Sequence, residues 1–193
     1  MAVDYETGEI FMKNCNEAGF YVEPKFFSWL VEHGYFTAPA STKYHGNFDG
    51  GLFQHHLAVY HRLRDLTAMN NLKWERPESP FIIGMFHDLC KCDQYKKVFG
   101  TEVELQPGVK RVDSNVAHYE YNDQLLLKGH GSKSVILLSQ FMTLTEEEIL
   151  CIRYHMGAYE KDEWPELDLA IRKCPNVLFA HLADMLASKI DGI

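Results

Sequence analysis

The sequence predicts a single all-α domain over residues 1–193, a helical bundle with one small β-hairpin inserted near residues 101–121. Three observations favour this fold class. Apolar residues recur at the three-to-four spacing of helices in several segments. Residues that cap helices stand where those segments begin. One stretch alternates with the period of a strand instead. A length of 193 residues suits one domain, and no linker, repeat or low-complexity tract interrupts it.

The first half of the chain predicts two helices separated by a loop. A helix is expected over residues 24–33, because Pro24 suits a first turn and Gly34 suits a stop. Residues 35–50 are rich in Gly, Pro, Ser and Asn and predict a loop. The helix that follows is expected at about 52–70, with an apolar stripe on its inner face. We expect the domain core to cover about 48–190, with 1–47 packed on it.

A third helix is expected to begin at Ser79-Pro80, with Ser79 as the cap and Pro80 in the first turn. It carries His87-Asp88 near its C-terminal end. The helical pattern then stops until Lys128, and Pro107-Gly108 predicts a turn between two short strands. The position of this hairpin directly after His87-Asp88 suggests a lip over a site, and the alternative is that it merely covers the core.

Three segments in the last third of the chain predict helices. His130, within Gly129-His130-Gly131, opens a helix that runs to about Phe141. Thr145 and Glu148 form a capping box that starts a helix through about Met156. The last helix is expected over about 176–190.

The composition excludes several classes of protein. No run approaches the roughly 18 apolar residues of a membrane span, and the N-terminus lacks the pattern of a secretory signal. Five cysteines without framework spacing are typical of reduced thiols, which predicts a cytoplasmic protein. The formal net charge of −8 disfavours binding to a long nucleic acid but leaves room for a small anionic substrate.

His87-Asp88 is the most informative pair in the sequence. It closes the apolar run 81–86, where two polar side chains are costly to bury unless they have partners. A divalent metal is such a partner for imidazole and carboxylate. Further donors stand in or beside other helix-like segments. Together they make six candidate ligands, enough for two ions: His55, His87, Asp88, His130, His155 and Asp184.

The order of these residues resembles the HD-domain superfamily of metal-dependent phosphohydrolases, in its six-ligand form. The resemblance covers about residues 48–190 and is nearest to the HD domain of bacterial 3′-to-5′ exoribonucleases and to small prophage-like HD proteins. The stretches that carry it are Gly50-Gly51-Leu52-Phe53-Gln54-His55-His56-Leu57, His87-Asp88-Leu89-Cys90-Lys91, Gly129-His130-Gly131-Ser132-Lys133-Ser134, Tyr154-His155-Met156-Gly157 and His181-Leu182-Ala183-Asp184-Met185-Leu186-Ala187.

The resemblance implies a role for each of these residues. Asp88 bridges two divalent ions (Mn, Fe, Mg, Ni, Co or Zn), and a water between them is the nucleophile. The first ion takes His55, His87 and Asp184, and the second takes His130 and His155. Lys91 contacts a phosphate oxygen, and Lys133 is a second candidate for the same contact.

The expected function is hydrolysis of a phosphate ester of a nucleotide or similar small metabolite. One alternative is a di-iron oxygenase, since imidazole and carboxylate suit iron equally well. Another is a non-catalytic module that binds a nucleotide. The chain has no Gly-Tyr-Pro signature after His155, which disfavours a cyclic dinucleotide phosphodiesterase.

The remaining histidines and two tyrosines have smaller expected roles. His56 and His181 are expected to support ligands or to pack. Tyr119 and Tyr121 either line a nucleobase pocket or pack within the hairpin. The other four histidines are expected to have no special role: His33, His45, His61 and His118.

Overall fold

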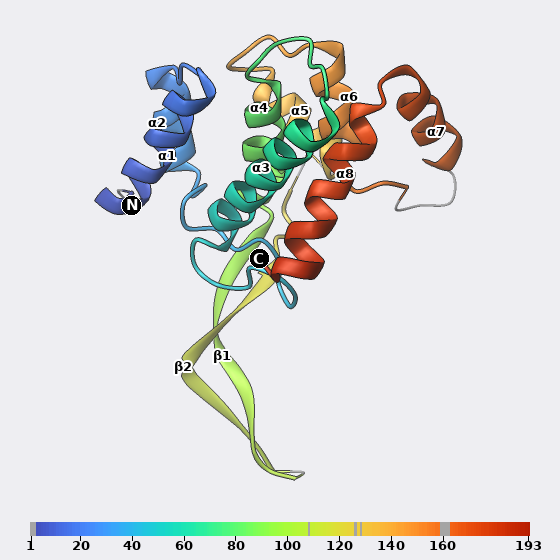
Figure 1. Ribbon diagram of the computed structural model, residues 1–193. Coiled ribbons are helices and arrows are strands. Elements are labelled where there is room, and N and C mark those ends of the chain that lie inside the picture. The colour runs from blue at the N-terminus through green and yellow to red at the C-terminus, as the bar shows by residue number, and fades with distance from the viewer. Residues whose placement is uncertain (1–2, 108, 126, 128, 159–162) are drawn as a thin grey trace.

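The computed structural model describes residues 3–107, 109–125, 127, 129–158 and 163–193. The described chain is mostly helical, with one two-stranded antiparallel sheet (Figure 1). The elements before the sheet are α1 (Tyr5–Ala18), α2 (Pro24–Glu32), α3 (Gly51–Asn70), α4 (Ser79–Phe86) and the 3-10 helix η1 (Leu89–Cys92). The sheet consists of β1 (Tyr95–Gln106) and β2 (Val109–Tyr121). After it come α5 (Gly131–Leu138), α6 (Glu146–Tyr154), α7 (Trp164–Lys173), α8 (Asn176–Leu186) and the π-helical turn η3 (Ala187–Asp191).

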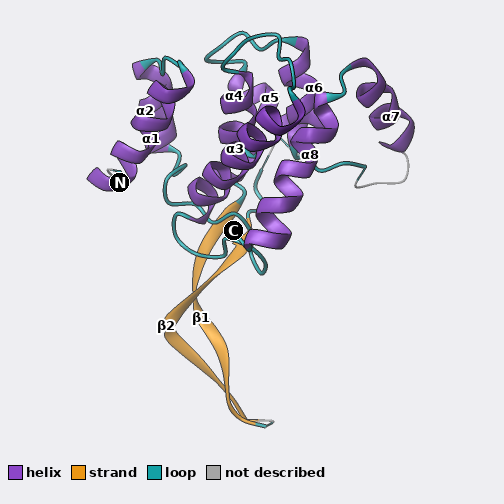
Figure 2. Ribbon diagram, in the orientation of Figure 1, coloured by secondary structure: helices purple, strands orange, loops and turns teal. Residues whose placement is uncertain are grey.

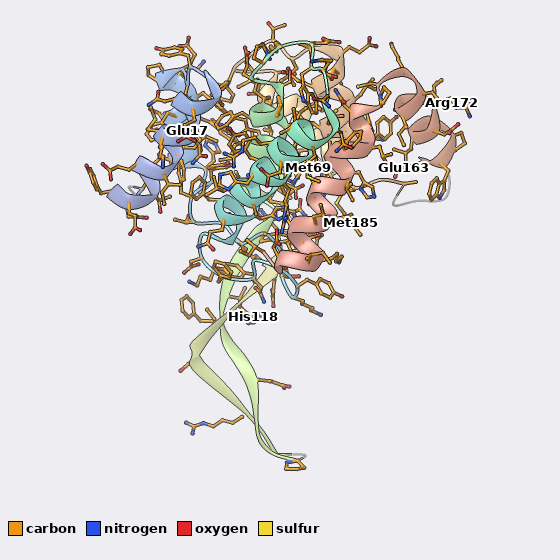
Figure 3. All side chains as sticks on the ribbon, in the orientation of Figure 1. Glu17, Met69, His118, Glu163, Arg172 and Met185 are labelled. Atoms are coloured by element: carbon orange, nitrogen blue, oxygen red, sulfur yellow. The ribbon has the colours of Figure 1, made fainter. Side chains whose placement is uncertain are left out.

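The helices α3, α4, α5, α6 and α8 form the central group, with α1 and α2 on one side and α7 on the other (Figure 2). Helix α3 packs against α4 and α8, and α6 packs against α8 and α5. Side chains fill the space between the ribbons, whereas Met69 and Met185 lie on the outside of α3 and α8 (Figure 3). The core is rich in aromatic rings: Phe11, Phe26, Tyr35, Phe36, Phe53, Phe81 and Phe86 are all buried.

Helices α1 and α7 were not predicted from the sequence. Helix α1 buries only a narrow stripe around Phe11 and Cys15, so its apolar pattern is weak. Its start is nevertheless capped by Asp4, whose carboxylate accepts a hydrogen bond from the backbone amide of Thr7 at 2.9 Å. In α7, Pro165 resembles a helix break in the sequence, but it stands in the first turn, where proline is well tolerated.

The predicted boundaries of the other helices hold to within a few residues. At the start of α4, however, Ser79 does not have the capping role that the sequence predicted. The residue before the helix is Glu78, and Ser79 is its first residue rather than its cap. The Ser79 hydroxyl donates to Glu148 Oε1 at 2.8 Å, and the Arg76 guanidinium holds both oxygens of the same carboxylate. Ser79 therefore ties the start of α4 to α6, where Thr145 and Glu148 form the predicted capping box.

The hairpin is longer than predicted and does not cover the helical body. Its strands pair from Tyr95 opposite Tyr121 to Gln106 opposite Val109, and the predicted turn lies between them, with Gly108 outside the described residues. The distal part extends away from the helices, so only its root can border a site (Figure 1). The prediction of a lip or cover therefore fails for most of its length.

Asp49 attaches the root of the hairpin to the loop before α3. Its carboxylate accepts a hydrogen bond from the ammonium of Lys97 on β1 at 2.5 Å and another from the hydroxyl of Tyr119 on β2. The ring of Tyr121 packs edge-on against Tyr95, with centroids 5.2 Å apart. These contacts assign Tyr119 and Tyr121 to the hairpin root.

Within the part of the chain that the structure describes, no helix combines the length and apolar character that crossing a lipid bilayer requires.

Gly84 marks the closest approach between α3 and α4. A Cβ atom placed on Gly84 would lie 2.5 Å from the Tyr60 Cα and 2.8 Å from its amide nitrogen. We expect Gly84→Ala to lower the free energy of unfolding by about 1–3 kcal/mol, because backbone atoms cannot move aside as a side chain can. Chemical denaturation measures the change.

The matched control is Gly8→Ala in α1. Its Cβ would meet nothing closer than 3.8 Å, so the substitution should leave stability unchanged or raise it by up to about 1 kcal/mol. Equal effects of the two substitutions would contradict the assigned contact.

Candidate metal centre

The six candidate ligands come from five helices and converge at the middle of the central group. Helix α3 contributes His55 and α8 contributes Asp184. The other four stand at helix ends: His87 caps the C-terminus of α4 and Asp88 follows it, His130 is the N-cap of α5, and His155 is the C-cap of α6. Helix ends can place polar groups together without burying them inside an apolar helix face.

Asp88 is the centre of this arrangement. Its Oδ1 lies 2.6 Å from His130 Nε2 and 3.2 Å from His155 Nε2. Its Oδ2 lies 3.7 Å from His87 Nε2 and 2.6 Å from the ammonium of Lys91. The two oxygens of one buried carboxylate thus face different sets of partners.

The second part of the centre contains His55, His87 and Asp184. His55 Nε2 lies 3.1 Å from Asp184 Oδ1 and 3.3 Å from His87 Nε2. Asp184 Oδ1 is also 3.8 Å from His87 Nε2. Atoms at these separations can share one ion after small side-chain movements.

Two groups of three residues place their donor atoms within 4.8 Å of one another: His55, His87 and Asp88 form one, and Asp88, His130 and His155 form the other. Asp88 belongs to both groups. Asp184 stands outside them but contacts two members of the first. These buried groups can hold a metal ion.

Backbone carbonyls orient three of the imidazoles. The Nδ1 atom lies 2.9 Å from the backbone oxygen of Ile193 in His55, 3.1 Å from that of Gly84 in His87 and 2.7 Å from that of Ile152 in His155. These oxygens accept the hydrogen bond, so Nδ1 carries a proton and Nε2 faces the centre. Metal-binding histidines in proteins have this second hydrogen bond.

Unpartnered nitrogen atoms provide an independent test of whether a metal fits. Among the described residues, the buried side-chain nitrogen and oxygen atoms without a hydrogen-bond partner are His130 Nε2, His155 Nε2, His45 Nδ1 and His56 Nε2. The first two approach Asp88 closely but without the alignment of a hydrogen bond. An ion between the carboxylate and the imidazoles would satisfy them, so the donor set fits a divalent metal.

Electrostatics and burial keep Asp88 and Asp184 ionised and His87 neutral, and these are the protonation states that bind a metal ion. Burial alone would raise the pKa of Asp88, but His130, Lys91 and the other imidazoles hold it well below its usual value. Burial also opposes ionisation of Asp184, yet the neighbouring histidines lower its pKa. Burial lowers the pKa of His87 to about 3 despite the pull of Asp88.

His155 behaves differently from His87. Burial would lower its pKa, but the Asp88 carboxylate outweighs that effect and raises it above the usual value. In the absence of an ion, a proton on His155 therefore offsets part of the negative charge of Asp88. A metal ion and this proton compete for the same nitrogen.

Lys91 lies in the centre, although it is not part of α4. That helix ends at Phe86. Lys91 belongs instead to η1, with its amide donating to the Asp88 carbonyl at 2.9 Å. Its side chain is only 6% exposed. Burial would lower its pKa, but Asp88 reverses that effect and raises it.

Lys133 is buried on α5 and pairs with the carboxylate of Asp93. Asp93 follows η1, so this ion pair joins α5 to the segment that carries Lys91. A role for Lys133 in binding phosphate stays a prediction.

Two more histidines support the centre from outside. His56 lies 3.1 Å from the Tyr35 hydroxyl, and its ring centroid is 4.8 Å from that of His87. The Tyr35 hydroxyl donates to the Met85 carbonyl at 2.6 Å. His181 Nδ1 lies 2.6 Å from the backbone carbonyl of His155. His56 thus packs beside a candidate ligand, and His181 fixes the backbone of another.

His45 was assigned no role from the sequence, but the structure brings it to the centre. Its ring centroid is 4.9 Å from that of His55, and burial lowers its pKa to about 4. Only its position shortly before the helix of His55 could have indicated this, because a loop has no periodicity from which to predict where a side chain points.

Comparison of the chain with protein-family models, with curated proteins and with solved structures found no match.

We expect Asp88→Asn to weaken divalent metal binding more than any other single substitution at the centre, since both donor groups share this carboxylate. The affinity should fall by on the order of 10–100-fold or more. Calorimetric titration with Mn²⁺ and metal analysis measure it. The metal should also raise the melting temperature of the wild-type protein by mass action.

The control is Asp168→Asn, an exposed residue that pairs with Arg172. Arg172 lies on the outside of α7 (Figure 3). It should bind metal like the wild type. Retention of wild-type affinity by Asp88→Asn would exclude the assigned centre.

Proposed function

We propose that the protein is a metal-dependent phosphohydrolase of the HD type, with a helical HD bundle as its fold. Its substrate would be a phosphate ester of a nucleotide or similar small metabolite, attacked by water activated between two ions. The observation that carries the proposal is the sharing of Asp88: two donor groups meet at this one buried carboxylate, beside a buried lysine.

The ligand assignment follows the two donor groups. Asp88 would bridge the ions, His55, His87 and Asp184 would complete one coordination shell, and His130 and His155 would serve the other. When bound, such ions lower the pKa of water and neutralise charge on a phosphoryl group. The order of ligands along the chain and their arrival at one point support this assignment.

Lys91 is the group that favours phosphate as the substrate. Its ammonium has three donors, and Asp88 Oδ2 occupies one of them at 2.6 Å. The remaining donors can hold an anionic oxygen next to the metal centre. With divalent ions bound, the site would be positively charged, which would explain how a chain with a net charge of −8 can bind an anion.

A panel of nucleotides and simple phosphate esters tests the proposal, with Mn²⁺, Co²⁺, Ni²⁺, Mg²⁺ or Fe²⁺ added to metal-free protein. We expect metal-dependent release of phosphate or nucleoside by the wild type and by Asp168→Asn, and none by Asp88→Asn. Absence of turnover with every metal would contradict the proposal.

The same preparations distinguish the alternatives. Oxygen consumption by protein purified anaerobically with bound iron would identify an oxygenase. Tight nucleotide binding without turnover would identify a binding module.

Lys91→Met should lower kcat/KM for the preferred substrate by roughly 10²-fold, because it removes a charged donor from the reacting phosphoryl group. The metal content should stay unchanged, because lysine is no ligand here. Steady-state kinetics and metal analysis on the same sample measure both quantities.

Lys25→Met, an exposed position on α2, is the control and should retain wild-type kinetics. Unchanged kcat/KM in Lys91→Met would remove Lys91 from the site.

A further inference from the structure

His45 lies on a loop whose backbone is fixed by several hydrogen bonds. The Ala40 amide donates to the Gly46 carbonyl at 2.9 Å, which closes the chain around residues 40–46. Inside it, the Ser41 hydroxyl donates to the His45 carbonyl at 2.7 Å and accepts the Tyr44 amide at 2.8 Å. The backbone that carries His45 is therefore held from both sides.

Close backbone contact joins this loop to the start of α3. A Cβ atom on Gly51, the first residue of α3, would lie 2.0 Å from the Gly46 carbonyl oxygen. Gly46 itself has φ +57°, and a Cβ there would lie 2.7 Å from that of Ala40. Both positions require glycine. The loop is thus clamped to the helix that carries His55 one turn later, which fixes the two imidazoles relative to each other.

The clamped imidazole has an unsatisfied buried atom. His45 Nδ1 is buried and has no hydrogen-bond partner, although the ring packs against that of His55 at 4.9 Å. A buried polar atom without a partner costs free energy, so a loop built this tightly around one is unexpected unless a ligand completes it. The groups that act electrostatically on His45 are His55, Lys91, Asp184 and Asp88.

A partner for His45 has to reach beyond the two groups of candidate metal donors. His45 belongs to neither group of donor atoms that converge on Asp88. It packs against His55 of the first group, and the charge of Lys91 acts on it. A group that reaches both His45 and the metal ligands needs several acceptor oxygens on one centre, which is the chemistry of a phosphoryl group.

We propose that His45 is a substrate-binding residue whose Nδ1 donates a hydrogen bond to a phosphoryl oxygen, on the His55 side of the centre. This inference rests on the proposed function. It places the phosphoryl group between the loop before α3 and η1, with His45 and Lys91 as its two protein donors. Both donors come from outside the metal-ligand set.

Binding of inorganic phosphate to the Mn²⁺-loaded protein tests this without turnover. His45→Leu removes the donor, whereas His45→Asn keeps an amide donor near the position of Nδ1. His45→Leu should lower phosphate affinity by about tenfold or more, and His45→Asn should recover most of the loss. Calorimetry measures the affinity, and metal analysis should show equal Mn²⁺ in all variants.

His33→Leu is the matched control, since His33 is exposed and stacks on Trp29 at the end of α2. It should bind phosphate like the wild type. If His45→Leu does not fold, His45→Gln replaces it, because its amide reaches the position of Nε2 rather than Nδ1. The Gln variant should then bind more weakly than the Asn variant.

Three results would overturn the inference, and they are distinguishable. Wild-type phosphate affinity in His45→Leu would remove His45 from the substrate site and leave the proposed function intact. Loss of Mn²⁺ from folded His45→Leu would make His45 a metal ligand. A wild-type protein that binds Mn²⁺ but no phosphate would contradict the proposed function itself.

Discussion

The burial of the Asp88 carboxylate is the constraint on which the rest of the structure depends. An ionised group in the interior is destabilising by several kcal/mol unless charges and donors surround it. Here two imidazoles face one oxygen, and an imidazole and an ammonium face the other. Removing any of these neighbours leaves a buried charge less compensated, so the ends of four helical elements are held to one point by electrostatics.

The way the helices end follows from that constraint. Helix α4 stops just before the His87-Asp88 pair, and η1 turns the chain so that Lys91 returns to the same carboxylate. The tighter 3-10 turn of η1 brings His87, Asp88 and Lys91 of one short segment to the same place.

The sequence predicted the helices with strong apolar periodicity. It also indicated six candidate ligands, because His and Asp in or beside apolar segments are conspicuous, and the structure brings their side chains together. The sequence-based predictions failed where a feature depends on contacts between residues that are distant in the sequence. Helix α1 has too narrow a buried stripe, Pro165 looks like a break, and the side chain of Ser79 satisfies Glu148 rather than its own helix. His45 was missed because its approach to His55 depends on two glycines in contact across a loop.

The attachment of the hairpin root at Asp49 has a consequence for motion. Asp49 holds both strands of the hairpin and lies in the same loop as His45, four residues further on. A long two-stranded ribbon is only marginally stable by itself. The loop itself is fixed by its own hydrogen bonds, so the motion that remains belongs to the distal ribbon. The Asp49 carboxylate and the continuous chain from η1 into β1 both join the root of this ribbon to the centre. A partner that binds the distal ribbon would therefore act on the centre through a root that is held at two points.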